Sequence, residues 1–348
     1  MTEKVLVTGG TGYVAGWVIV ALLERGYEVR TTVRSPAKEK AVRDAVSTVT
    51  APGDRLSFAV ADLTADEWWD AAVAGVDHVL HVASPLGDED SRDAEALIVP
   101  AREGALRVLR AASAAGVKRV VMTSAANAAS PSSYTEEGVT DETLWTDPDD
   151  PTLIPYRRSK TVAEKAAWDF VADDEGSTTL TTILPGAVFG PILTTRNLGS
   201  VRIIERMVAG RMPGTPRIGL EIVDVRDLAD IHIRAMTSPE AAGQRFLATG
   251  EFTWMREVAQ ALRAGLGPAG AKVPTRQLPD FVVRFASLFD RPLRAITVSL
   301  GRRNRHSTEK ARRVLGWQPR PAAETVVDCA RSLIDWGVVQ VDKGQREG

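Results

Sequence analysis

The chain of 348 residues has a single cysteine, Cys329, and only four histidines. One cysteine excludes an internal disulfide, and neither residue type occurs with the spacing of a zinc site, so we expect no metal. No uninterrupted apolar stretch approaches the ~18 residues of a membrane-spanning helix. The first strand pattern begins at Lys4, which leaves no room for a signal peptide. We therefore expect a cytoplasmic protein without a membrane partner.

A large net charge of either sign is also missing. The 43 basic and 45 acidic residues give a formal net charge of −2. A nearly balanced surface has no broad basic field, so nucleic acid is not the expected partner. The length exceeds that of one ordinary domain, and a core domain with a second lobe is expected.

The residues that are present carry a clear signal near the N-terminus. An apolar run (Val5, Leu6, Val7) is followed by glycines at 9, 10 and 12, and a helical pattern starts at Val14. Strand, glycine turn and helix in this order are typical of a dinucleotide-binding unit. Gly9 allows a sharp turn, and Gly12 allows the backbone to approach a pyrophosphate at the helix start.

The second expected strand, residues 28–33, ends at Arg34. An NAD site usually has a carboxylate at this place, bonded to the ribose 2′-hydroxyl. No acidic residue occurs from Arg30 to Pro36, and Arg34, Lys38 and Lys40 supply positive charge instead. A 2′-phosphate would meet attraction here, so the sequence favours NADP(H).

Tyr156 and Lys160 lie four residues apart in an expected helix, so they share one face. An ordinary tyrosine ionises near ~10, and an ammonium group nearby favours the phenolate. The phenol can then exchange a proton with a carbonyl or an alcohol oxygen at neutral pH. The pair indicates acid–base chemistry when it is taken together with the N-terminal motif.

The pattern of the first half alternates strands and helices, which predicts an α/β fold with a doubly wound parallel sheet. We expect residues 1–185 to form the cofactor domain, with 218–249 returning to its sheet, and residues 186–217 and 250–325 to form a smaller, discontinuous substrate lobe. Residues 342–348 have the composition of a polar tail. Strands are expected at 4–8, 28–33, 56–60, 77–82, 119–123, 179–184, 218–225 and 244–249, and helices at 14–25, 37–48, 66–73, 92–115, 157–172 and 225–237.

The chain resembles the extended short-chain dehydrogenases/reductases, and within them the branch of dihydroflavonol 4-reductases, cinnamoyl-CoA reductases and aldehyde or ketone reductases. The similar stretches occur in the family's order along nearly the whole chain. They are Val7–Tyr13, Thr32–Arg34, Asp62-Leu63, His81–Pro85, Asp141–Trp145, Tyr156–Trp168 and Arg312–Trp317.

The resemblance implies a Rossmann-type fold and a role for each matching residue. Tyr156 would be the proton donor, and Lys160 would also bind the nicotinamide ribose. Other residues are expected to contact NADP(H): Gly9, Thr11, Gly12, Tyr13, Val14, Arg34, Lys40, Asp62, Leu63, Val82, Ala83, Ser84, Pro185 and Val188.

One position departs from the family pattern. The family usually ends its fifth strand in Thr-Ser-Ser, with the second serine binding the substrate carbonyl, whereas this chain has Thr123, Ser124 and Ala125. Neighbouring residues of a strand point to opposite faces. Either the strand end bends so that Ser124 serves, or a neighbouring donor such as Thr123 or Asn127 substitutes, or the catalyst is weakened. Ser124 is our expectation.

We expect an NADPH-dependent carbonyl reductase that converts an aldehyde or ketone to an alcohol, acting as a monomer or homodimer on a small molecule. Two alternatives remain: a nucleotide-sugar epimerase or dehydratase with bound NAD, and a non-catalytic NADP(H)-sensing protein. The cluster Arg302–Arg305 is either a solvated turn or a site for an anionic group.

Overall fold

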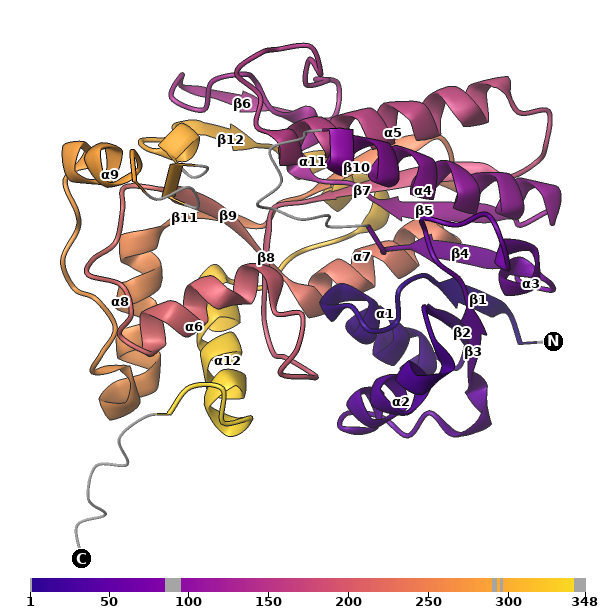
Figure 1. Cartoon of the computed structure of the whole chain (residues 1–348), viewed down its shortest axis with the longest axis horizontal. Coiled ribbons are helices and arrows are strands. Elements are labelled where there is room, and N and C mark those ends of the chain that lie inside the picture. Colours follow the sequence, from indigo (N-terminus) through magenta and orange to yellow (C-terminus); the bar gives the residue numbers. More distant parts are fainter. Residues whose placement is uncertain (1, 85–94, 290–292, 295–296, 341–348) are drawn as a thin grey trace, which may run out of the picture.

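The computed structural model describes residues 2–84, 95–289, 293–294 and 297–340 (Figure 1). Its main sheet has seven strands, all parallel, in the order β10-β7-β5-β4-β1-β2-β3. The order reverses between β1 and β4, as in a doubly wound sheet, so the expected fold class is confirmed. The strands are β1 (Lys4–Val7), β2 (Glu28–Val33), β3 (Leu56–Val60), β4 (His78–His81), β5 (Arg119–Thr123), β7 (Thr179–Pro185) and β10 (Gln244–Ala248).

Helices cover both faces of this sheet, which is why its strands are nearly continuous apolar runs. Val5 and Val7 pack toward one face and Leu6 toward the other, because side chains alternate along a strand. The first face carries α1 (Tyr13–Glu24), α2 (Glu39–Ser47), α7 (Val225–Thr237) and α11 (Glu309–Leu315), and the second carries α3 (Trp69–Val73), α4 (Glu95–Ala114) and α5 (Pro155–Asp173). Within the described ranges no helix is long and apolar enough to span a bilayer.

A smaller lobe is built on a three-stranded sheet, in which β9 (Gly219–Asp224) lies between β8 (Ala187–Phe189) and β11 (Glu251–Trp254). Its core includes Met207, Leu262 and the fully buried Cys329. The helices of this core are α6 (Arg202–Val208), α8 (Met255–Leu266) and α12 (Ala322–Asp335), and α9 (Asp280–Ala286) lies at its edge (Figure 1). Separately, β6 (Gly138–Thr140) pairs in parallel with β12 (Asn304–His306).

The return of residues 218–249 to the main sheet differs from the expectation. Only α7 and β10 return, whereas β9 pairs with β8 and β11. The switch between the sheets occurs at Gly250, which has φ +67° and where a Cβ would lie 1.8 Å from the carbonyl oxygen of Ile222. The lobe core also continues beyond residue 325, through α12 to Val339. The expected tail, 342–348, lies outside the described residues.

The expected helix 66–73 is shorter in the structure and begins only at Trp69. Trp68 has φ +71°, a conformation that interrupts a right-handed helix. Only Trp69 of this tryptophan pair packs into the core, while Trp68 is 56% exposed.

Candidate active site

Tyr156 and Lys160 lie in the first two turns of α5. The helix starts here because Ile154 is extended and Pro155 occupies the first helical position, where its missing N–H costs nothing. The Tyr156 side chain is 40% exposed. The Lys160 ammonium lies 5.9 Å from the centroid of the Tyr156 ring. The expected pair is therefore formed, with the tyrosine open to an incoming molecule.

Burial lowers the pKa of Lys160 to about 8. His81, at the end of β4, lies close enough to sense this ammonium group. Burial first, and then the Lys160 charge, lower the pKa of His81 to about 3. The His81 Nδ1 atom lies 2.9 Å from the Thr8 hydroxyl, which also accepts the Ala83 amide. His81 is therefore a neutral structural residue, and Lys160 is the positively charged group beside Tyr156.

The glycine turn has the geometry of a phosphate cradle. Gly9 has φ +73°, and a Cβ there would lie 2.7 Å from the Cβ of Ala83. A Cβ on Gly12 would lie 3.2 Å from the Gly9 carbonyl oxygen. Gly12 precedes α1 without any side chain capping the first amides. These free amides fit the pyrophosphate of a dinucleotide, and side chains at the two glycines would fill its place.

The basic residues expected at the 2′-phosphate differ in availability. Arg34 is exposed at the end of β2, and no other described residue forms a hydrogen bond or ion pair with its side chain. Hydrogen bonds from Thr64 hold the pKa of Asp62 below its usual range, and the charge of Arg34 adds to this effect. Lys40 is instead paired with Asp44 at 2.6 Å. Arg34 is therefore the more available partner for an anion.

Other expected cofactor residues hold neighbouring segments together. The Tyr13 hydroxyl donates to the Gly190 carbonyl, and burial raises the pKa of Tyr13 well above its usual value. The Asn197 amide donates to the Thr11 carbonyl, so the segment after β8 lies over the glycine turn. Val14 lies in the first turn of α1 and is half-buried. Leu63 follows β3, and Val82 and Ser84 follow β4, and all three are half-buried. Val188 lies in β8, and Pro185 is buried at the end of β7. Pro85 lies outside the described residues.

The Ser124 hydroxyl is engaged inside the protein. The Ser124 side chain is 3% exposed, and its hydroxyl donates to the Glu164 carboxylate at 2.6 Å. Thr182 and Arg245 donate to the same carboxylate, at 2.7 Å and 2.9 Å. Ser124 was expected to bind the substrate carbonyl, but in the structure its hydroxyl is already bonded within a buried network beneath α5. Sequence reasoning missed this network because Glu164 and Arg245 are far apart in the chain.

The other residues near this strand end leave one free donor. The Thr123 hydroxyl lies 2.7 Å from His232 Nε2, on the side of α7, and Ala125 has no polar side chain. Asn127 follows in a short 3-10 turn, Ala126–Ala129, and its Oδ1 accepts the Tyr134 hydroxyl at 2.6 Å. No described residue accepts a hydrogen bond from the Asn127 Nδ2 group. Its two N–H bonds are available to a ligand.

Comparisons with known proteins agree with this arrangement. The model of the NAD dependent epimerase/dehydratase family matches residues 5–248. The chain belongs to this family, the extended short-chain dehydrogenases/reductases. Ketoreductase azaE of Aspergillus niger is 31% identical over 96% of this chain and 98% of its own. Cinnamoyl-CoA reductase 1 of Arabidopsis thaliana is 37% identical over 71% of this chain and 70% of its own.

Among solved structures, Gre2 from Candida albicans in complex with NADPH superposes with a TM-score of 0.80. It is 27% identical and covers 96% of this chain and 99% of its own. These relatives confirm the resemblance that the motifs indicated.

The buried network generates a prediction about Ser124. Ser124→Ala removes one of the donors to Glu164 and leaves the buried carboxylate less well satisfied. We expect the free energy of unfolding to fall by about 1–3 kcal/mol, while turnover per folded molecule changes little. Urea denaturation and steady-state rates measure the two effects. Thr182→Val, which removes a second donor to the same carboxylate, is the matched control, and a large loss of turnover at unchanged stability would restore Ser124 to the active site.

Proposed function

We propose that this NADP(H)-dependent oxidoreductase reduces the carbonyl group of a small-molecule aldehyde or ketone to an alcohol, with Tyr156 as the proton donor. The exposed phenol beside the Lys160 ammonium carries this proposal. The relative named ketoreductase supports it, since that name describes the reduction of a ketone.

When bound, the dihydronicotinamide supplies the hydride for this reaction. Tyr156 donates its hydroxyl proton to the carbonyl oxygen, so that the product leaves as an alcohol. The Lys160 ammonium stabilises the phenolate that remains. With a pKa of about 8, Lys160 is mostly protonated at neutral pH and loses its charge as the pH rises through 8. Carbonyl reduction should therefore slow above that pH.

The residues of this chain that would hold the cofactor come from the glycine turn after β1, the end of β2 and helix α5. The amides at the start of α1, after Gly12, would bind the pyrophosphate, because no side chain caps them. The Arg34 guanidinium would bind the 2′-phosphate with the paired hydrogen bonds that such an anion favours. Lys160 would reach the nicotinamide ribose, as the family resemblance implies.

Asn127 is the best candidate to bind the substrate carbonyl in place of the missing serine. Its Oδ1 atom is held by Tyr134, which fixes the orientation of the amide and leaves Nδ2 as a donor. Ser124 and Thr123 are both engaged elsewhere. A fixed N–H donor aimed at the carbonyl oxygen stabilises the negative charge that develops there during reduction.

The central prediction concerns Tyr156. Tyr156→Phe should abolish carbonyl reduction while NADPH binding is retained, since only the hydroxyl group is removed. A panel of aldehydes and ketones, followed by the loss of NADPH absorbance, provides the substrate, and fluorescence titration measures cofactor binding. Turnover near the wild-type rate in this variant would contradict the proposal. Tight NADPH binding without turnover of any carbonyl compound by the wild type would favour a sensing protein.

A second prediction concerns the choice of cofactor. Arg34→Gln should weaken NADPH binding by about tenfold to a hundredfold, the range expected for hydrogen bonds to a charged group. NADH binding should hardly change, since it lacks the 2′-phosphate. Lys40→Gln is the matched control, because its ammonium group is already paired with Asp44. Equal losses for the two cofactors, or a larger effect at Lys40, would disprove the role of Arg34.

A third prediction tests Asn127. Asn127→Asp keeps an oxygen for Tyr134 but removes the N–H donor, so turnover should fall by about 10²–10³, as for the loss of an oxyanion-hole donor. Asn127→Leu should show the same loss without an added charge, and NADPH binding should persist in both. Ala125→Ser, combined with Asn127→Leu, should recover part of the rate by restoring a hydroxyl. Unchanged turnover in Asn127→Leu would rule the amide out.

A further inference from the structure

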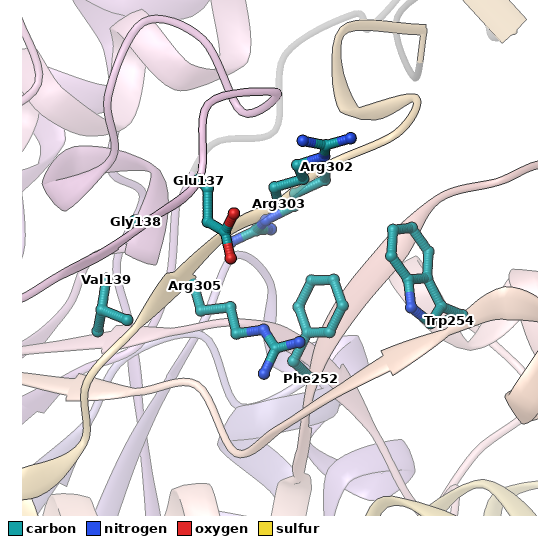
Figure 2. A pocket seen from close by; sticks show the side chains of 8 residues that line it. All are labelled: Glu137, Gly138, Val139, Phe252, Trp254, Arg302, Arg303 and Arg305. Carbon is teal, nitrogen blue, oxygen red and sulfur yellow. The ribbon is translucent and has the colours of Figure 1, made fainter.

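A cavity lies where β6 and β12 meet β11 of the smaller lobe (Figure 2). Its volume is about 420 Å³, within the range of small-molecule sites. Two aromatic and four charged side chains define it: Phe252, Trp254, Arg302, Arg303, Arg305 and Glu137. The residues proposed for carbonyl reduction do not line it, so its chemistry is a separate question.

The aromatic side of the cavity is a preformed platform. The rings of Phe252 and Trp254 meet edge to face, with centroids 5.2 Å apart. Phe252 lies directly over Gly219 of β9, where a Cβ would come within 2.1 Å of the ring. Both rings remain only half-buried. A glycine at 219 thus creates the space for the Phe252 ring, and an exposed apolar surface is held in place for a planar ligand.

The three arginines differ in what they already bind. The Arg302 guanidinium donates to Glu221 at 2.6 Å, and His306 lies 2.6 Å from the same carboxylate. Burial alone raises the pKa of the Glu221 carboxyl, but the bonds from His306 and the charge of Arg302 hold that pKa below its usual value. Arg302 is therefore neutralised within the fold.

Arg303 and Arg305 are exposed, and in the described part of the chain neither side chain forms a hydrogen bond or an ion pair. Figure 2 shows the Arg305 side chain beside Phe252. The Arg305 guanidinium lies 4.8 Å from the centroid of the Phe252 ring. Glu137, also exposed, is the one carboxylate that lines the cavity. Two free cations against one carboxylate leave the cavity with a net positive charge.

We propose that this cavity binds a planar organic anion, with the ring stacked on Trp254 against the edge of Phe252 and a carboxylate or phosphate at Arg303 and Arg305. Guanidinium groups bind such anions through paired hydrogen bonds, and stacking on aromatic rings adds selectivity for a planar body. The cavity is linked to the candidate active site through one side chain. Arg302 lies 4.6 Å from the centroid of Tyr134, whose hydroxyl holds Asn127. Binding in the cavity does not depend on the proposed reaction.

The test is titration calorimetry of the full chain at low salt with three probes: 2-naphthoate, the neutral 2-naphthalenemethanol, and inorganic phosphate. 2-Naphthoate should bind at least about tenfold more tightly than either of the others, since only it offers both ring and charge. Arg303→Gln and Arg305→Gln should each weaken 2-naphthoate binding by about tenfold. Arg110→Gln, an exposed arginine of α4 in the other lobe, is the matched control and should change nothing.

Glu137→Gln should change the affinity for 2-naphthoate in the opposite direction to the two arginine substitutions. Removal of its carboxylate should tighten 2-naphthoate binding, a result that damage to the fold cannot produce. Three outcomes would overturn the proposal. Equal affinity for the neutral alcohol would show that charge is not recognised, and equal affinity for phosphate would show that the aromatic platform is not used. Unchanged binding after substitution of both Arg303 and Arg305 would place the ligand elsewhere.

Discussion

The buried carboxylate of Glu164 is the interaction on which the candidate active site depends. It accepts hydrogen bonds from Ser124, directly after β5, from Thr182 in β7 and from Arg245 in β10. A buried ion pair is stable only when its remaining groups are satisfied. Arg245 meets that condition, since its other N–H groups donate to the carbonyls of Glu142, Leu144 and Ala128. Its guanidinium carbon lies 3.5 Å from the centroid of the Trp145 ring. This network fixes α5 against three strands and thereby fixes Tyr156 and Lys160.

The same network explains the departure from the usual serine. Because the Ser124 hydroxyl donates to Glu164 beneath α5, it is unavailable to a substrate. The next position, residue 125, is an alanine. The polar group that remains is the Asn127 amide, oriented by Tyr134. The Tyr134 ring in turn lies between two guanidinium groups, with Arg157 at 4.5 Å and Arg302 at 4.6 Å from its centroid. The Asn127 amide, the proposed carbonyl donor, is thus oriented through Tyr134 by contacts with Arg157 and Arg302.

The sequence predicted what local patterns determine. The glycine turn, the alternation of strands and helices and the Tyr156–Lys160 spacing depend on residues close together in the chain, and so do the positions of most strands and helices. The hydrogen bond from Ser124 to Glu164 could not be predicted, because the same carboxylate also binds Arg245, which lies 81 residues after Glu164 in the chain. The sheet to which β9 belongs is likewise decided by its pairing with β8 and β11, not by its own residues. The cavity at β6, β11 and β12 combines Glu137, Phe252 and Arg305, which only the folded chain brings together.

Burial of the charged Lys160 side chain lowers the stability of the fold, although the proposed reaction uses that charge. Burial lowers its pKa to about 8 from an ordinary value near ~10.4, so between these values the unfolded chain binds the proton and the folded chain does not. The contribution of Lys160 to the free energy of unfolding therefore rises with pH across this window. The charge that stabilises the Tyr156 phenolate is lost across the same window. His81 stays neutral beside it, with a pKa near 3, and so does not lower the Lys160 pKa further. An alkaline shift thus favours the fold at this position and disfavours proton transfer, which indicates that the half-buried cation serves the reaction and not the stability of the protein.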